Sequence, residues 1–465
     1  MELNLRLFMD RAQRYFPNGR ITTRLPDEST HRYTYADWAV RVRRLASRLQ
    51  AVGVQPGDRV ATFAWNTYRH FELYFALPCA GCVLHTVNLR LADEHVVYIL
   101  NHARDTAIFV DPDLLPVIER VWSQLETVKT VVVLSDRVPT SGLSNVVAYE
   151  DLIRDGDGDH RFQELPERTP AGMCFTSATT GMPKGVIYTH RDIYLHTITE
   201  CLPDVLGIAE RDTILPVVPM FHANAWGLPF AAVATGASLV LPGERPHAPV
   251  ILDLIVREQV TFAAAAVSIG IDMQAETRRQ RRDISCLRGI MLGGSATPAA
   301  LMEFFADEFG VPVHTAWGST EMTPLATSLH IPRELVNAPI REQIPVRVRQ
   351  GIPCPGTELK VLDESGAEIP WDDQAMGEIH VRTPWSTTEY FNDARTKDGF
   401  VDGWWKSGDI STVNTSGVLR LVDRAKDLIK SGGEWISSVD LENALVAHPA
   451  VREAAVVGIP DEKWL

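Results

Sequence analysis

The chain has 465 residues, of which 45% are hydrophobic and 22% charged, so it can bury a large core and should form more than one domain. Its formal net charge of −14 excludes a global field that would attract nucleic acid or an anionic membrane. The charged N-terminus has no apolar signal-peptide core, and nowhere do about 18 apolar residues run together. We therefore expect a cytoplasmic protein without a transmembrane segment.

Helical and strand-like patterns alternate along the chain. Helical spacing of apolar residues or a buried apolar run predicts a helix at 35–54, a strand at 58–66, a helix at 94–104, a strand at 106–111, a helix at 251–260 and a strand at 261–267. This order predicts an α/β fold with layered, mostly parallel sheets and helices. The segment from about 135 to 172 is rich in Pro, Gly, Asp and Ser and is interpreted as a loop or subdomain joint.

The six cysteines are few for this length and fit a reducing compartment. Cys79 and Cys82 form a lone C-x-x-C, which is open to interpretation as a redox pair or half of a metal site. No second such pair and no histidine pair completes a zinc set, and small apolar residues surround both thiols. We expect them to fill space in the core at a helix end.

Residues 176–185 read "TSATTGMPKG" and follow a strand-like "MCF". Hydroxyls and backbone N–H groups on a tight turn form a nest for anionic oxygens, and Lys184 adds a point charge. The loop is not a Walker motif, because its lysine follows a proline and precedes a glycine. A surface turn with an incidental lysine is the alternative, but ten consecutive fitting residues favour polyphosphate binding. The candidate ligands are Thr176, Ser177, Thr179, Thr180, Gly181 and Lys184.

This stretch is similar to the signature T-S-G-T-T-G-x-P-K-G of the acyl-adenylate-forming superfamily, and in particular to bacterial medium- and long-chain fatty acyl-CoA synthetases. Further segments resemble the family's blocks in the same order and extend the similarity over nearly the whole chain: "PMFHANAW" at 219–226, "GGSATP" at 293–298, "AWGSTE" at 316–321, "WWKSGD" at 404–409 and "DRAKDLIKSGGEWISSVDLE" at 423–442.

The resemblance implies a ligase that turns a carboxylate and MgATP into acyl-AMP and pyrophosphate, after which CoA thiolate displaces AMP. ATP, Mg²⁺ and CoA are the implied cofactors, and a homodimer is implied by analogy alone. Two alternatives stay open. An altered acyl pocket suggests an amide-forming ligase that passes the acyl group to an amine or amino acid, and a missing lysine, described below, suggests a non-catalytic adenylate-binding or acyl-CoA-binding protein.

The family's nucleotide residues carry over by position. Glu321 resembles the Mg²⁺ ligand, a hard carboxylate oxygen of the type that ion selects. Thr320 would donate to the α-phosphate, Asp409 would accept both ribose hydroxyls, and Arg424 would assist it. Trp317 stands where the family usually has tyrosine, so adenine should stack on a larger ring. The remaining nucleotide contacts implied are Gly294, Ser295, Ala296 and Gly318.

The resemblance also implies an acyl site, and for His222 and Trp226 plain core packing is the alternative. His222 would order the acyl carboxylate, and Trp226 resembles a tryptophan that gates the acyl tunnel. Gly270 sits where a bulky residue is common, which predicts a wider pocket for a branched, cyclic or aromatic acid. Lys430 and Trp435 line up with residues that contact the adenylate and the acyl group. Lys184, His222, Glu321 and Lys430 are the implied catalytic residues.

Asp423 resembles the hinge of the family, so we expect an N-terminal adenylate-forming domain at 1–422 and the start of a small mobile α+β domain at 423–465. The "SGG" at 431–433 suits a hairpin whose glycines allow close approach. Family members continue beyond the point reached here, with a lysine that contacts the adenylate, and no residue of this sequence is assigned to it. We expect a trimmed chain rather than a defective enzyme.

Ala178 replaces the middle glycine of the phosphate loop. If that position requires a positive φ, its methyl group costs about 1 kcal/mol and stiffens the loop. We therefore expect the Ala178→Gly variant to turn over faster than the wild type in a steady-state assay, and equal turnover of the two proteins would contradict this.

Overall fold

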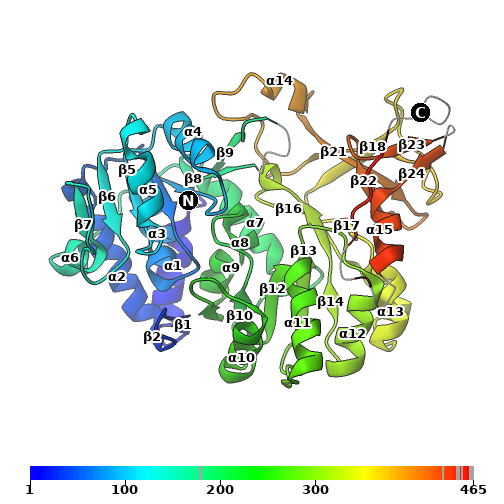
Figure 1. Ribbon diagram of the computed structural model, residues 1–465, viewed down its shortest axis with the longest axis horizontal. Coiled ribbons are helices and arrows are strands. Elements are labelled where there is room, and N and C mark those ends of the chain that lie inside the picture. Colours follow the sequence, from blue (N-terminus) through cyan, green and yellow to red (C-terminus); the bar gives the residue numbers. More distant parts are fainter. Residues whose placement is uncertain (177–180, 432–433, 447–450, 452–453, 460–465) are drawn as a thin grey trace. The chain divides into compact units, whose positions relative to one another are not determined.

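The computed structural model describes residues 1–176, 181–431, 434–446, 451 and 454–459 (Figure 1). The chain divides into two compact units. Unit 1 comprises Met1–Ala263, Ser319–Pro324 and Trp385–Ala394, and unit 2 comprises Ala264–Gly318, Leu325–Pro384 and Arg395–Leu465. No helix in the described ranges is both long and apolar enough to cross a membrane.

Unit 1 contains helices and strands in alternation. Its helices are α1 (Leu5–Tyr15), α2 (Tyr35–Arg48), η1 (Leu49–Val52), α3 (Tyr68–Cys79), α4 (Asp93–Ala103), α5 (Leu115–Val121), η2 (Trp122–Gln124), α6 (Tyr149–Arg154), α7 (His190–Glu200), α8 (Ala223–Trp226), α9 (Leu228–Thr235), α10 (Ala248–Glu258) and η3 (Thr320–Met322). Its strands are β1 (Arg20–Arg24), β2 (Thr30–Thr34), β3 (Arg59–Phe63), β4 (Val83–Thr86), β5 (Ala107–Val110), β6 (Thr130–Val133), β7 (Val146–Ala148), β8 (Pro170–Phe175), β9 (Gly185–Thr189), β10 (Thr213–Pro216) and β11 (Ser238–Leu241).

The main sheet of unit 1 has seven strands in the order β7-β6-β5-β3-β4-β8-β9. All neighbours are parallel except β8 and β9, which are antiparallel. Ile108 and Val110 of β5 join a core with apolar residues of α4 and α5, while Phe109 points to the other face and contacts Tyr149 of α6. Burial on both faces explains why these strands are short continuous apolar runs. The predicted α/β layering is confirmed.

The remaining strands of unit 1 form a second group, in which β10 and β1 each pair with β11 in parallel and β2 pairs with β1 antiparallel. The prediction of a joint at 135–172 is wrong in part. Residues 146–148 form β7 at the edge of the main sheet, and α6 follows directly. Three residues are too few to show an apolar period, so the surrounding Gly and Asp residues dominated the pattern.

Unit 2 begins as the chain leaves unit 1 through β12 (Phe262–Ala266). Its helices are α11 (Val267–Arg279), α12 (Ala299–Phe309), η4 (Arg333–Leu335), α13 (Ile340–Arg347), α14 (Thr396–Gly399) and α15 (Ser438–Val446). Its strands are β13 (Gly289–Gly293), β14 (Val313–His314), β15 (Ala316–Gly318), β16 (Leu325–Ser328), β17 (Ile352–Pro353), β18 (Glu358–Leu362), β19 (Gly377–Arg382), β20 (Phe400–Val401), β21 (Trp404–Val413), β22 (Leu419–Arg424), β23 (Ile429–Ser431) and β24 (Glu434–Ile436).

The strands of unit 2 after β14 are paired antiparallel in three groups, β15-β16-β17, the five-stranded sheet of β18 to β22, and the hairpin β23-β24. The hairpin predicted around the "SGG" sequence is therefore confirmed, although Gly432 and Gly433 lie outside the described residues. The domain boundary predicted at Asp423 falls within β22 and stays a prediction.

The C-x-x-C pair is part of the core. Cys79 ends α3, Cys82 follows it, and both thiols are free and buried. Burial raises the pKa of each to about 12, so the reactive thiolate is disfavoured. This confirms the interpretation of the pair as core residues.

A buried cluster of charges joins α2, α3 and α6 in unit 1. Arg41 donates from Nε to Glu72 at 2.7 Å and from its two terminal nitrogens to Glu150 at 2.8 and 3.0 Å. Tyr149 donates to the other oxygen of Glu72 at 2.5 Å. Because Glu72 is fully buried, its charge depends on these partners.

We predict that Arg41→Ala lowers the free energy of unfolding by about 3 kcal/mol, because it leaves a carboxylate buried without its cation. Urea denaturation followed by circular dichroism measures this. The matched control is Arg120→Ala, which breaks an exposed ion pair with Asp93 that solvent screens. Equal stability of the two variants would show that the buried cluster contributes no more than an exposed pair.

Candidate active site

The loop predicted to bind phosphate connects β8 to β9 in unit 1. Its two ends are tied together, since Thr176 N–H donates to the carbonyl of Lys184 at 2.9 Å and Lys184 N–H donates to the Thr176 hydroxyl at 3.2 Å. Gly181 has a φ of 81°, which favours glycine. Ser177, Ala178, Thr179 and Thr180 lie outside the described residues. The predicted turn at a strand end is confirmed, and its role in binding phosphate stays a prediction.

The side chain of Lys184 is joined to Glu321 through a tyrosine. Lys184 Nζ donates to the hydroxyl of Tyr390 at 2.9 Å, and that hydroxyl donates to Oε1 of Glu321 at 2.7 Å. Glu321 is only 5% exposed and Tyr390 3%. Two predicted site residues that are far apart in sequence are thus brought together. Tyr390 was not predicted, because nothing in "STTEYFND" distinguishes this segment from a surface loop.

Glu321 is held by the short helix η3. The turn is closed by Ser319 N–H, which donates to the carbonyl of Pro324 at 2.8 Å. Tyr188 of β9 donates to the carbonyl of Thr320 at 2.7 Å, so the strand that follows the phosphate loop also fixes η3. Thr320 itself is buried. The main chain around Glu321 is therefore anchored on the same strand that begins one residue after Lys184.

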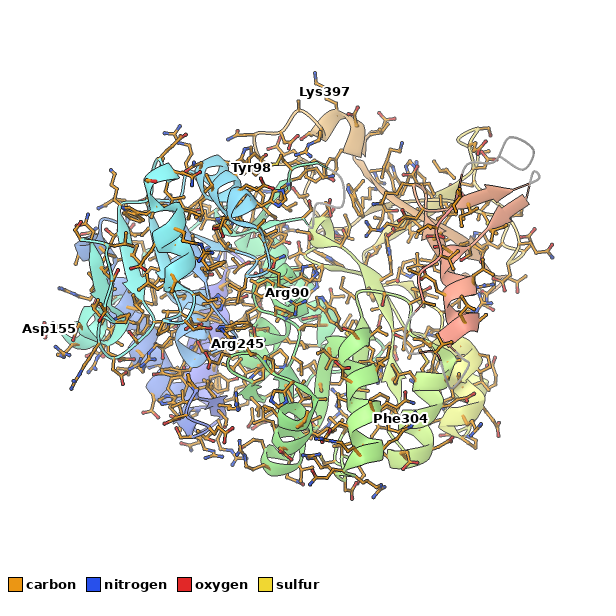
Figure 2. The ribbon with its side chains drawn as sticks, viewed as in Figure 1. Arg90, Tyr98, Asp155, Arg245, Phe304 and Lys397 are labelled. Atoms are coloured by element: carbon orange, nitrogen blue, oxygen red, sulfur yellow. The ribbon has the colours of Figure 1, made fainter. Side chains whose placement is uncertain are left out.

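His222 precedes a turn of left-handed helix. The four residues of α8, Ala223–Trp226, have φ values of 41°, 55°, 51° and 55°, and Gly227 follows at 84°. Such backbone costs on the order of 1 kcal/mol per non-glycine residue and is often found at functional sites. Trp226 is half-buried. Burial and the nearby charge of Arg90, labelled in Figure 2, lower the pKa of His222, so its imidazole is neutral at pH 7.

A second buried pair lies directly against this turn. His196 Nδ1 and Glu200 Oε2 of α7 are 3.8 Å apart, and a methyl group on Gly227 would lie 2.5 Å from that oxygen. Burial raises the pKa of Glu200 well above its ordinary value and lowers that of His196 to about 3. The two groups are therefore neutral neighbours rather than an ion pair. Helical spacing alone would not have identified them.

The predicted nucleoside residues of unit 2 line one cleft of about 940 Å³. These residues come from four separate segments of the sequence and are Gly294, Ser295, Ala296, Trp317, Gly318, Asp409 and Arg424; the predicted hinge residue Asp423 lines the same cleft. Gly294 has a φ of 85°, so the loop after β13 turns as only glycine does easily. In the sequence these residues belong to separate blocks, and the structure places them around one cleft.

Asp409 lies at the centre of the polar contacts in this cleft. The indole N–H of Trp317 donates to its Oδ2 at 2.8 Å, and Arg424 Nε lies 3.4 Å from its Oδ1. The ring of Trp317 also stacks on Trp405, with centroids 6.5 Å apart and planes at 27°. Trp317 is only 5% exposed. The indole therefore orients a carboxylate, a role that the sequence analysis did not foresee.

The structure gives the surroundings of the remaining predicted residues but does not test their predicted roles. Asp423 accepts from the backbone N–H and the hydroxyl of Ser438, both at 2.7 Å, and so caps the start of α15. A methyl group at Gly270 would lie 2.9 Å from Leu292, so leucine side chains border the space it leaves and the wider acyl pocket stays a prediction. Lys430 and Trp435 pair in the β23-β24 hairpin, and their side chains lie outside the described residues.

The residues present are compatible with Mg²⁺ bound together with ATP. Within the described ranges, no group of three or more His, Cys, Asp or Glu side chains is arranged around a metal position. Mg²⁺ in nucleotide sites commonly takes one or two carboxylates and completes its shell with phosphate oxygens and water. The buried carboxylate of Glu321 fits that donor set.

Known proteins identify the family. Residues 9–391 match the family model described as AMP-binding enzyme, and residues 440–465 match that of the AMP-binding enzyme C-terminal domain. A long-chain-fatty-acid–CoA ligase of Thermus thermophilus is 42% identical over 100% of this chain and 84% of its own length. A 3-methylmercaptopropionyl-CoA ligase of Ruegeria pomeroyi is 40% identical over 98% of this chain and 85% of its own.

A solved anthranilate CoA ligase in complex with anthranoyl-AMP has a TM-score of 0.89 and 26% identity, over 99% of this chain and 86% of its own. The family match spans most of the chain, and each of these three relatives is a CoA ligase. The chain therefore belongs to the AMP-binding enzyme family, as an adenylate-forming acid–thiol ligase.

Proposed function

We propose that the chain activates a fatty or related carboxylic acid with ATP, releasing pyrophosphate, and that CoA thiolate then attacks the acyl carbon and displaces AMP. The observation that carries this proposal is the cleft of unit 2, where the residues predicted for adenine and ribose come together around Asp409. The names of the relatives supply CoA as the acceptor and fatty or sulfur-containing acids as substrates.

The phosphate side of the reaction is assigned to Lys184, Thr320 and Glu321. An anionic acid must approach a polyanion, so the site must offset charge and hold the attacking oxygen in line with the α-phosphorus. Lys184 would bind phosphate oxygens as a point charge, and Glu321 would hold Mg²⁺. The bound metal would supply charge stabilisation to the phosphates. Thr320 would donate its hydroxyl to the α-phosphate.

The nucleoside side is assigned to unit 2. Asp409 would accept the ribose hydroxyls, and the donors Trp317 and Arg424 fix its two oxygens in place. Gly318 and Ser319 are consecutive, so the strand that carries Trp317 leads directly into η3 with Glu321. Trp317 and Glu321 are therefore only four residues apart in the sequence.

The acyl side is assigned to His222 and Trp226. A neutral imidazole can donate to the acyl carboxylate without forming an ion pair that would weaken the nucleophile. The left-handed turn stores backbone strain next to Trp226, and a change of that turn would move the indole. This supports the proposed gating role. A pocket discriminates only about 1–3 kcal/mol per methylene, so a panel of acids rather than a single acid tests the specificity.

We predict acyl-AMP and pyrophosphate formation from ATP and at least one acid of a panel of straight-chain, branched, aromatic and sulfur-containing acids. Mass spectrometry of the products, with CoA or amines added in turn, measures this. Glu321→Gln should lower pyrophosphate release by at least about 100-fold, as is typical for loss of a charge-stabilising group. No acyl-AMP with any acid would overturn the proposed function, and acyl transfer only to amines would favour amide formation.

We predict that Trp317→Phe weakens AMP binding about tenfold, because it removes a hydrogen bond to a charged group worth about 1.5–3 kcal/mol while it keeps an aromatic ring for stacking. Isothermal titration calorimetry measures the Kd. Trp371→Phe, at an indole that is 58% exposed, is the control and should bind AMP normally. An unchanged Kd in Trp317→Phe would contradict an orienting role for the indole N–H.

A further inference from the structure

Tyr390 occupies the position between the two charged groups of the phosphate side. Its hydroxyl accepts from Lys184 Nζ at 2.9 Å and donates to Glu321 at 2.7 Å. The ammonium group also lies 4.0 Å from the centroid of the tyrosine ring, within the range of a cation–π interaction. One buried phenol therefore contacts a cation through its oxygen and its ring, and an anion through its proton.

The segment that carries Tyr390 is fixed to both partners by its main chain. Thr387 N–H donates to the carbonyl of Glu321 at 3.0 Å, and Phe391 N–H donates to the carbonyl of Gly185 at 2.8 Å. These two bonds flank Tyr390 on its own segment. The first acceptor belongs to Glu321 itself, and the second belongs to Gly185, which follows Lys184 in the chain. The position of the phenol is thus set by backbone, which is more rigid than side-chain contact alone.

A neutral bridge has a chemical advantage over a direct ion pair. Lys184 and Glu321 in direct contact would neutralise each other and would have to separate before either bound a ligand. A phenol between them holds the two groups at a fixed spacing without pairing them directly. An ammonium group has three donors and a carboxylate about four acceptor positions, so each partner can keep its bond to the hydroxyl and still bind an ionised ligand.

We propose that Tyr390 is a positioning residue that sets Lys184 and Glu321 at the spacing required for metal-bound triphosphate. This inference deepens the proposed function and rests on it for the roles of Lys184 and Glu321. It predicts that the hydroxyl contributes more to binding of ATP with its metal than to binding of ATP alone, because only the first ligand engages both charged groups.

The test compares Tyr390→Phe, which keeps the ring, with the wild type. Calorimetry of ATP with Mg²⁺, and of ATP with excess chelator, gives two Kd values for each protein without any acid or turnover. We expect Tyr390→Phe to bind MgATP about tenfold more weakly and metal-free ATP nearly as well as the wild type. Equal weakening for both ligands, or no weakening of MgATP, would overturn the bridging role.

The matched control is Tyr35→Phe, which removes another buried tyrosine hydroxyl, one that donates to the carbonyl of Ala237 at 2.7 Å. It should bind both ligands normally. If it loses MgATP affinity as much as Tyr390→Phe, the effect is general destabilisation and the inference fails. A wild type that binds MgATP but forms no acyl-AMP would overturn the proposed function while leaving the role of Tyr390 intact.

Discussion

The proposed site depends on one constraint, which is that a cation and a buried carboxylate lie close together without direct contact. The protein carries a net charge of −14, so attraction for a polyanion must come from a few local groups. Lys184 and Glu321 have opposite charges and are joined through one neutral hydroxyl. This arrangement keeps the cation available for phosphate and the anion available for a metal, since neither is consumed by the other. Two backbone bonds of the segment 385–394 hold that spacing, together with the bond from the Tyr188 hydroxyl of β9 to the carbonyl of Thr320 in η3.

Two other buried titratable groups in unit 1 are neutral. His196 and Glu200 lie close together but lose their charges, because burial shifts their pKa values apart. Glu72 is a third case, because this buried carboxylate accepts hydrogen bonds directly from the guanidinium of Arg41 and the hydroxyl of Tyr149. His196 and Glu200 are almost fully buried, whereas the side chain of Arg41 is 22% exposed, so burial and direct partners together distinguish these two pairs. Among these three arrangements of described residues, the one with the neutral bridge keeps the cation and the anion from pairing directly.

Much of the fold was predictable because many of its helices and strands are long enough to show an apolar pattern. Helix α2 and strands β3 and β5 were recognised from spacing and apolar runs, whereas β7 was missed because three residues carry no period. The ordered blocks supplied the predicted nucleoside residues that line the unit 2 cleft. Tyr390, the indole bond of Trp317 and the left-handed turn were not predictable, since each depends on contacts or φ angles between residues of ordinary type.

Trp317 illustrates how one departure from a family pattern changes a site. A tyrosine at this position, as the resemblance would suggest, offers a hydroxyl at the far end of its ring, whereas an indole presents its N–H from the side of a larger ring. Here that N–H bonds the carboxylate of Asp409 while the same ring stacks on Trp405. Stacking fixes the plane of the indole, and the plane fixes the direction of the hydrogen bond. The aromatic pair thus determines which oxygen of Asp409 is already engaged and which faces Arg424.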